Sequence, residues 1–325
     1  MTLPEISLLK QRGSEALAPH CQQAKKLITL HTVAVLALNF LVLLMTVLLD
    51  RGIVSTDGLR GMQTRSILTT VQLVLEYAML ILLPFWQISW LYVVLKFYRG
   101  NRAETSDFLT GFRKFGPVLR LTILKSLIFT GLIFAGVYAG YFVILATPLA
   151  NPLMEVIATS TDPEAMYDAA MLAMEQIEVP ILLIGGGISL LLCIPFFYRF
   201  RLAEYFLLDN PDFGARAALR ASRRMMRGNA WRMAKLDLSF WWFWLLSVLT
   251  AAIAYADLLL PLFGVTLPIP EDIAFIAAFV LSAPAQLLLY RGCKLRVDAT
   301  YAAAYEALIP PAQPSVSVSF PAPQE

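Results

Sequence analysis

A run of arginines is the part of this sequence best suited to binding chemistry. Five of them recur at helical spacing: Arg216, Arg220, Arg223, Arg224 and Arg227. At about 100° per residue they fall within about a quarter of a helical wheel. The other side of the wheel carries small and apolar residues: Ala218, Leu219, Ser222, Met225 and Met226. The pattern predicts an amphipathic helix at the membrane surface, with its basic face toward anionic headgroups.

The ends of this helix are also marked in the sequence. Asn210 offers a capping side chain, and Pro211 suits the first helical position. Gly228 is a natural C-terminal stop. We therefore expect one helix from residue 210 to residue 228. A second interpretation stays open, in which the arginines only keep a connecting helix in the cytoplasm. Nucleic-acid binding is not indicated, because no recognised fold accompanies the arginines.

A second set of polar residues falls inside apolar segments: Asn39, Gln72, Glu76, Gln87 and Asp257. Glu76 lies about 15 Å along its segment by helical rise. A charge at that depth costs about 2.5–3.5 kcal/mol, so Glu76 is expected to face the bundle interior or to become protonated. These residues either line a polar cavity or proton-linked path, or they join helices by hydrogen bonds. Asp257 is close enough to a helix end to reach the outer interface.

Residue types used for catalysis or metal binding do not cluster. The three cysteines, Cys21, Cys193 and Cys293, form no C-x-x-C pair, which argues against disulfides and structural zinc. His20 and His31 have no clustered carboxylates or cysteines to complete a metal site. Nucleotide-binding loops, H-E-x-x-H and nucleophile elbows are absent. The sequence therefore predicts a protein that is not an enzyme and that has no catalytic residue, cofactor or metal ion.

Membrane helices are the elements that must position these residues. The chain is 58% hydrophobic and 15% charged, whereas soluble domains have about 45–50% apolar and about 25% charged residues. A spanning helix needs about 20 apolar residues. Six segments meet this need: residues 27–49, 66–95, 121–149, 179–198, 238–263 and 273–290. The expected fold is all-α, a polytopic six-helix membrane bundle over residues 27–308 with short cytoplasmic interfacial helices.

The distribution of positive charge predicts the orientation of the bundle. If the N-terminus is inside, all 26 lysines and arginines except Arg51, Arg60 and Arg65 belong to cytoplasmic segments or adjoin them. The segment Asn151–Glu178 carries carboxylates and no basic residue, and it falls outside. The positive-inside rule therefore places both termini in the cytoplasm. These are an N-terminal segment of residues 1–26 and a proline-rich tail of residues 309–325 that we expect to be disordered.

Small residues predict close helix packing. Gly136 and Gly140 form a G-x-x-x-G step in the third segment, and the fourth carries the run 185–187 of three glycines. Small residues let membrane helices approach each other closely. We expect these glycines to serve packing rather than to open a gap for a substrate.

Several cytoplasmic residues resemble the hallmark of a known family. The matching residues are Asp209, Pro211, Ser222, Met226, Gly228, Leu238, Ser239, Phe240 and Trp242. Asp107, Phe108, Gly111 and Phe112 are similar to its shorter upstream element, and residues 299–306 are similar to its closing helix. On these residues the chain resembles the bacterial membrane-protein family known as domain of unknown function 975. The resemblance implies a bacterial cytoplasmic membrane and a multi-span helical bundle, and it implies no established activity.

Two functions are consistent with these features. The first is a non-enzymatic, lipid-interacting scaffold or accessory subunit in envelope homeostasis, with the arginine helix binding anionic lipid or a membrane-protein partner, which can be a second copy of the chain. The alternative is a transporter of a small solute or amphipathic molecule with Glu76 in its cavity. The chain lacks the inverted repeats and paired broken helices typical of secondary transporters.

Overall fold

The structure is a computed structural model that describes residues 2–50, 58–151, 154–155, 163–210, 213–256, 259–260 and 271–309. The described residues form helices joined by turns, with no strand among them. They belong to two compact units, one of residues 1–115 with 231–325 and one of residues 116–230. Asp257, Pro211 and the tail beyond residue 309 lie outside the described residues.

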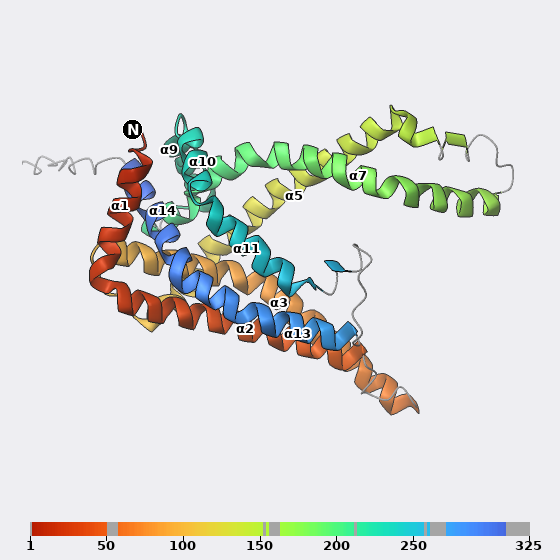
Figure 1. Cartoon of the computed structure of the whole chain (residues 1–325), viewed down its shortest axis with the longest axis horizontal. Helices are drawn as coiled ribbons and strands as arrows, with labels where there is room; N and C mark the ends of the chain where they lie inside the picture. The colour runs from red at the N-terminus through yellow and green to blue at the C-terminus, as the bar shows by residue number, and fades with distance from the viewer. Residues whose placement is uncertain are drawn as a thin grey trace, which may run out of the picture. The chain divides into compact units, whose positions relative to one another are not determined.

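The first unit contains long apolar helices and shorter helices at one end. Its elements are α1 (Ile6–Leu17), η1 (Ala18–His20), α2 (Cys21–Asp50), α3 (Gly58–Tyr98), η2 (Thr105–Leu109), α4 (Thr110–Arg113), α11 (Trp241–Ala254), α13 (Glu271–Leu289), the π-helical turn η4 (Tyr290–Lys294) and α14 (Leu295–Leu308). Helix α2 packs against α3 and α13, α11 packs against α13, and α1 packs against α14 (Figure 1). The core of this unit is therefore made by helices from both ends of the chain.

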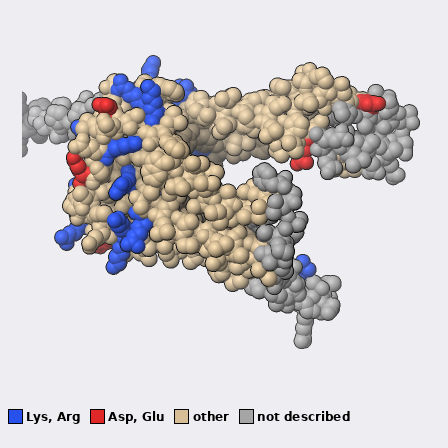
Figure 2. Space-filling model, viewed as in Figure 1, with Lys and Arg blue, Asp and Glu red and all other residues tan. Residues whose placement is uncertain are grey.

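Polar contacts hold one end of the first unit together. The indole nitrogen of Trp90 donates to the buried carboxylate of Asp298 (2.7 Å), which also accepts from Lys294 (2.8 Å). Arg99, at the end of α3, pairs with Glu306 of α14 (2.6 Å). Lysines and arginines gather at this end of the unit, whereas other residues cover the length of its long helices (Figure 2). This separation of charge along the helices is what the positive-inside rule requires.

The second unit is built on two long helices. Its elements are α5 (Phe115–Leu145), η3 (Pro148–Ala150), α7 (Pro163–Phe200), α8 (Ala203–Asp209) and α9 (Ala215–Met226). Helix α7 begins well before the predicted span 179–198, so part of the acidic segment 151–178 is helical. Another helix, α10 (Ala230–Leu238), starts at the end of this unit.

The glycines of α5 lie directly against α7. A methyl group added at Gly136 would come within 2.2 Å of Ser189 Oγ, and one at Gly140 within 2.4 Å of Gly185 Cα. The packing prediction for Gly136 and Gly140 is therefore confirmed. Of the three glycines in α7 only Gly185 makes such a contact, since nothing lies within 4 Å of an added methyl group at the other two.

The described helices include enough apolar spans for a multi-pass membrane protein. Five are long and apolar enough to cross a bilayer, and a sixth span results if α10 and α11, which meet at 63°, are counted together. Large apolar side chains on these helices are exposed, for example Leu183 and Leu191, which are 72% and 71% accessible. Such surfaces suit lipid rather than water. The predicted fifth span, residues 238–263, begins at this bend, and its described part is mainly α11.

Candidate anion-binding site

The candidate site lies in the second unit, where α9 packs against the end of α7. Helix α9 consists of strong helix formers, mainly alanine, arginine, leucine and methionine. It buries Ala218, Leu219 and Met226 and exposes its arginines. The sequence pattern thus identified the two faces of this helix. The apolar face packs on α7 and α8, so α9 is also a structural part of the second unit.

A single buried hydroxyl joins α9 to the end of α7. Ser222 Oγ donates to the carbonyl oxygen of Arg199 (2.8 Å) and accepts from the backbone nitrogen of Leu202 (3.2 Å). Both backbone groups lie at a helix end, where they lack partners within the helix. The contact therefore fixes the last turn of α7, which carries Arg199, beside the arginines of α9.

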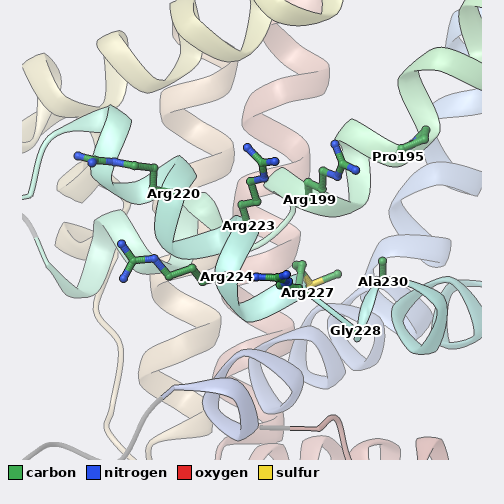
Figure 3. Close-up of a pocket in the computed structure, with 9 residues that line it drawn as sticks. Pro195, Arg199, Arg220, Arg223, Arg224, Arg227, Gly228 and Ala230 are labelled. Carbon is green, nitrogen blue, oxygen red and sulfur yellow. The ribbon is translucent and has the colours of Figure 1, made fainter.

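These helix ends enclose a cavity of about 660 Å³, which we term the arginine cavity (Figure 3). The described residues that line it are Pro195, Arg199, Arg220, Arg223, Arg224, Met226, Arg227, Gly228 and Ala230. Arg199 and Arg223 extend toward the same side of the site (Figure 3). Arg216 is exposed on α9 but is not among these lining residues.

The arginine cavity is strongly positive. Five guanidinium groups line it, and none of its described lining residues is acidic. Glu204 on α8 forms an ion pair with Lys125 of α5 (2.5 Å), which already provides a counter-charge for that carboxylate. Like charges one helical turn apart repel each other by a few tenths of a kcal/mol. A bound anion would remove this repulsion and would accept charge-assisted hydrogen bonds in the planar geometry that arginine offers to phosphate.

The structure places four of the five predicted arginines around one cavity and adds one arginine from another helix. Arg220, Arg223, Arg224 and Arg227 line the cavity, and Arg199 joins them from another helix. Sequence reasoning missed Arg199 as a site residue because its neighbourhood depends on the Ser222 hydrogen bonds. Its position at the end of an apolar segment was the only available signal.

The predicted start of the arginine helix is wrong. Asn210 is the residue that ends α8, and its backbone nitrogen and its side-chain amide both donate to the carbonyl of Phe206. Helix α9 begins later, after Gly214 in an extended conformation. At the other end, Gly228 has a φ of +81°, which glycine adopts without strain, so the predicted stop is correct.

The predicted intramembrane polar residues lie in different surroundings. Gln72 Nε2 donates to Glu76 (2.9 Å) and to Thr46 Oγ1 of α2 (3.0 Å). Glu76 itself is exposed on the surface of α3 rather than facing the bundle interior, and the hydrogen bond to α2 comes from Gln72. Gln87 is also exposed. Asp257 lies outside the described residues.

Asn39 and Thr46 line a second cavity, of about 520 Å³, between α2, α11 and α13 in the first unit. We term it the hydroxyl cavity because serine and threonine side chains contribute to its wall. Glu76 is connected to it through Gln72 and Thr46. Elsewhere in the first unit, the ring of His31 stacks on Trp86 and Phe108. Among the described residues, no group of three or more histidine, cysteine or acidic side chains could hold a metal ion.

A comparison with protein families identifies the wider group of this chain. The model of the family described as "Protein of unknown function (DUF975)" matches residues 22–282. The chain belongs to the DUF975 family. No curated protein and no solved structure matches it.

The residues that resemble the DUF975 hallmark hold turns and helix contacts in the described structure. Asp107 caps η2 by accepting from the backbone nitrogen of Glu104 (2.7 Å), and it also pairs with Lys96 (2.9 Å). A methyl group at Gly111 would meet the carbonyl oxygen of Phe85 at 2.3 Å. Ser239 donates to the carbonyl of Leu236 (2.6 Å) at the bend between α10 and α11. In the first unit, these three hallmark residues therefore have structural roles.

Proposed function

We propose that this DUF975 protein is a non-enzymatic scaffold or accessory subunit of a bacterial cytoplasmic membrane, with cytoplasmic termini, that binds anionic lipid headgroups in the arginine cavity. The observation that carries the proposal is the set of five guanidinium groups around one cavity, with no acidic residue among its described lining. A phospholipid headgroup of negative charge provides the missing counter-charge.

The position of the cavity supports a lipid rather than a soluble anion as ligand. Arg199 lies in the last turn of the apolar helix α7, at the point where exposed apolar side chains such as Leu191 give way to charged ones. Phospholipid phosphates lie at this boundary between the hydrocarbon core and water. The chemistry of recognition is that of phosphate and guanidinium, which form paired, charge-assisted hydrogen bonds.

Two single substitutions test whether the cavity, rather than the total charge of α9, binds the headgroup. We expect Arg199→Gln to weaken the binding of dioctanoyl phosphatidylglycerol about tenfold, because it removes one charge-assisted hydrogen bond worth about 1.5 kcal/mol. Arg216→Gln removes the same charge from α9 outside the lining residues, and we expect it to change the affinity less than about twofold. Titration of the full-length protein in detergent measures both affinities. Equal effects of the two variants would contradict the cavity as the binding site.

Transport of a small solute is a second candidate function, supported by the hydrogen-bonded connection from Glu76 through Gln72 to Thr46. In this function Glu76 exchanges a proton while the hydroxyl cavity holds the substrate. If the protein transports, Glu76→Gln abolishes proton-coupled uptake into proteoliposomes, because the amide cannot titrate. Uptake at the wild-type rate in this variant would contradict a role of Glu76, and wild-type proteoliposomes without uptake would contradict transport.

A further inference from the structure

The hydroxyl cavity lies within the first unit, and its wall comes mainly from three apolar helices. Helix α2 contributes Asn39 and Thr46, α11 contributes Ser247 and Thr250, and α13 contributes Ser282 and Gln286. Ligand-binding pockets in proteins usually measure about 300–1,000 Å³, so a cavity of about 520 Å³ can hold a small molecule or part of a lipid.

Four hydroxyl groups of the wall have already used their hydrogen atoms. Ser247 donates to the carbonyl of Phe243 (2.8 Å), and Ser282 donates to the carbonyl of Phe279 (2.9 Å). Thr46 and Thr250 likewise donate to backbone carbonyls of their own helices. These bonds satisfy the hydroxyl hydrogens and leave oxygen lone pairs as the groups that remain for a ligand.

The amide of Asn39 also bonds to its own helix. Its Nδ2 donates to the carbonyl of Val35 (2.8 Å), one turn earlier on α2. This contact fixes the orientation of the amide, because only the nitrogen can donate to a carbonyl. The side-chain oxygen of Asn39 is therefore an acceptor on the cavity wall. A ligand that brings a hydrogen-bond donor can therefore pair with this oxygen.

The same wall argues against a charged ligand. None of the described lining residues is charged, and the rest of the wall includes Phe275, Phe279 and Leu43. Burial of a charge without an opposite charge costs several kcal/mol, whereas a hydroxyl group bonded to one of these oxygens incurs no such penalty. The aromatic and aliphatic residues suit an apolar body attached to the donor.

We propose that the hydroxyl cavity binds an uncharged amphiphile with a free hydroxyl group, of the kind represented by a diacylglycerol, with the hydroxyl donating to wall oxygens such as that of Asn39. The inference is independent of the arginine cavity, which lies in the other unit and takes an anion. A neutral lipid and an anionic phospholipid are thus assigned to different sites on one chain.

Photo-crosslinking of the full-length protein with a diacylglycerol that carries a diazirine on one acyl chain tests this inference. We expect labelled peptides from α2, α11 or α13. Unlabelled dioctanoylglycerol should compete. A diacylglycerol with a methylated hydroxyl should compete at least about fivefold less well, since one neutral hydrogen bond is worth about this factor. Dioctanoyl phosphatidylglycerol should also compete less well, because its charge finds no opposite charge in the cavity. Competition by all three lipids with equal strength would contradict the assignment of a neutral donor.

Two bulky substitutions on α11 separate the cavity from the outer surface of the helix. Ala251 lines the cavity, and Leu249 is exposed and is not among the described lining residues. We expect Ala251→Phe to fill the cavity and to reduce labelling at least about tenfold, because the ligand would no longer fit. Leu249→Phe should label like the wild type. A thermal melt shows that both variants are folded. Wild-type labelling of a folded Ala251→Phe variant would overturn the proposal, as would labelling outside these three helices.

Discussion

A variant with Gly136→Leu is expected to lose the folded second unit, whereas Gly131→Leu on the same helix is expected to fold normally. An added Cβ at Gly136 would lie 2.2 Å from Ser189 Oγ and 2.5 Å from the backbone of the same residue. Backbone atoms of α7 cannot move aside as the end of a flexible side chain can. The two long helices would therefore have to separate.

The expected cost of Gly136→Leu is about 3 kcal/mol or more, at the upper end of the range for an overpacked interior. Separation also removes the hydrogen bond from Ser189 to the carbonyl of Ile133 (3.0 Å), which crosses between α7 and α5. In a membrane, close approach of small residues is a main source of helix association. Few other contacts between α5 and α7 can replace this close approach.

Gly131→Leu is the matched control, because nothing lies within 4 Å of an added Cβ at this position. Thermal unfolding and size-exclusion chromatography of both variants in detergent measure the difference. The interpretation of α5 and α7 as a closely packed pair would be wrong if Gly136→Leu melted at the wild-type temperature.

Local patterns in the sequence predict the elements of this fold well. The apolar segments lie on helices, and the periodic arginines lie on the exposed face of α9, since both features depend only on residues close together in the chain. The predicted end at Gly228 is correct for the same reason, because a positive φ is a local property. The start of α9 is less well marked, because Asn210 can serve either helix that it adjoins.

Features that depend on distant contacts could not be predicted. The role of Arg199 follows from the hydroxyl of Ser222, which brings two helix ends together. The exposure of Glu76 could not be predicted either, because in a membrane helix the lipid-facing and packed sides are both apolar. The pattern placed Gln72 and Glu76 on one side of α3, and only the position of α2 decides which of the two contacts a neighbour.

The bend in the fifth apolar segment also has no clear signal in the residue pattern. Apolar residues continue through Phe240 and Trp241, yet α10 ends at Leu238 and α11 begins at Trp241. The bend occurs where the Ser239 hydroxyl binds the carbonyl of Leu236 and the Ser239 carbonyl accepts from Lys10 of α1 (3.1 Å). The latter contact joins residues that are 229 positions apart in the chain.

Neutralising all five arginines of the cavity should have the largest effect on binding. Substitution by glutamine at Arg199, Arg220, Arg223, Arg224 and Arg227 should weaken the binding of dioctanoyl phosphatidylglycerol about a hundredfold, which corresponds to two charge-assisted hydrogen bonds of about 1.4 kcal/mol each. The fold should survive, because these side chains are exposed and the buried face of α9 is unchanged.

A second variant with the same change in net charge is the control. It replaces five exposed basic residues of the first unit by glutamine: Lys25, Lys26, Arg102, Arg113 and Arg296. These residues attract anions only through their general field, which salt screens over about 10 Å at 0.1 M. The control should therefore bind the lipid within about threefold of the wild-type affinity, since no direct contact is removed.

The most direct test of the proposed function is the affinity of the wild-type protein and of these two variants for dioctanoyl phosphatidylglycerol, measured side by side in detergent at 0.1 M salt. Our account predicts about a hundredfold weaker binding for the cavity variant and nearly unchanged binding for the control. Equal weakening in both variants, or wild-type affinity in a folded cavity variant, would contradict it.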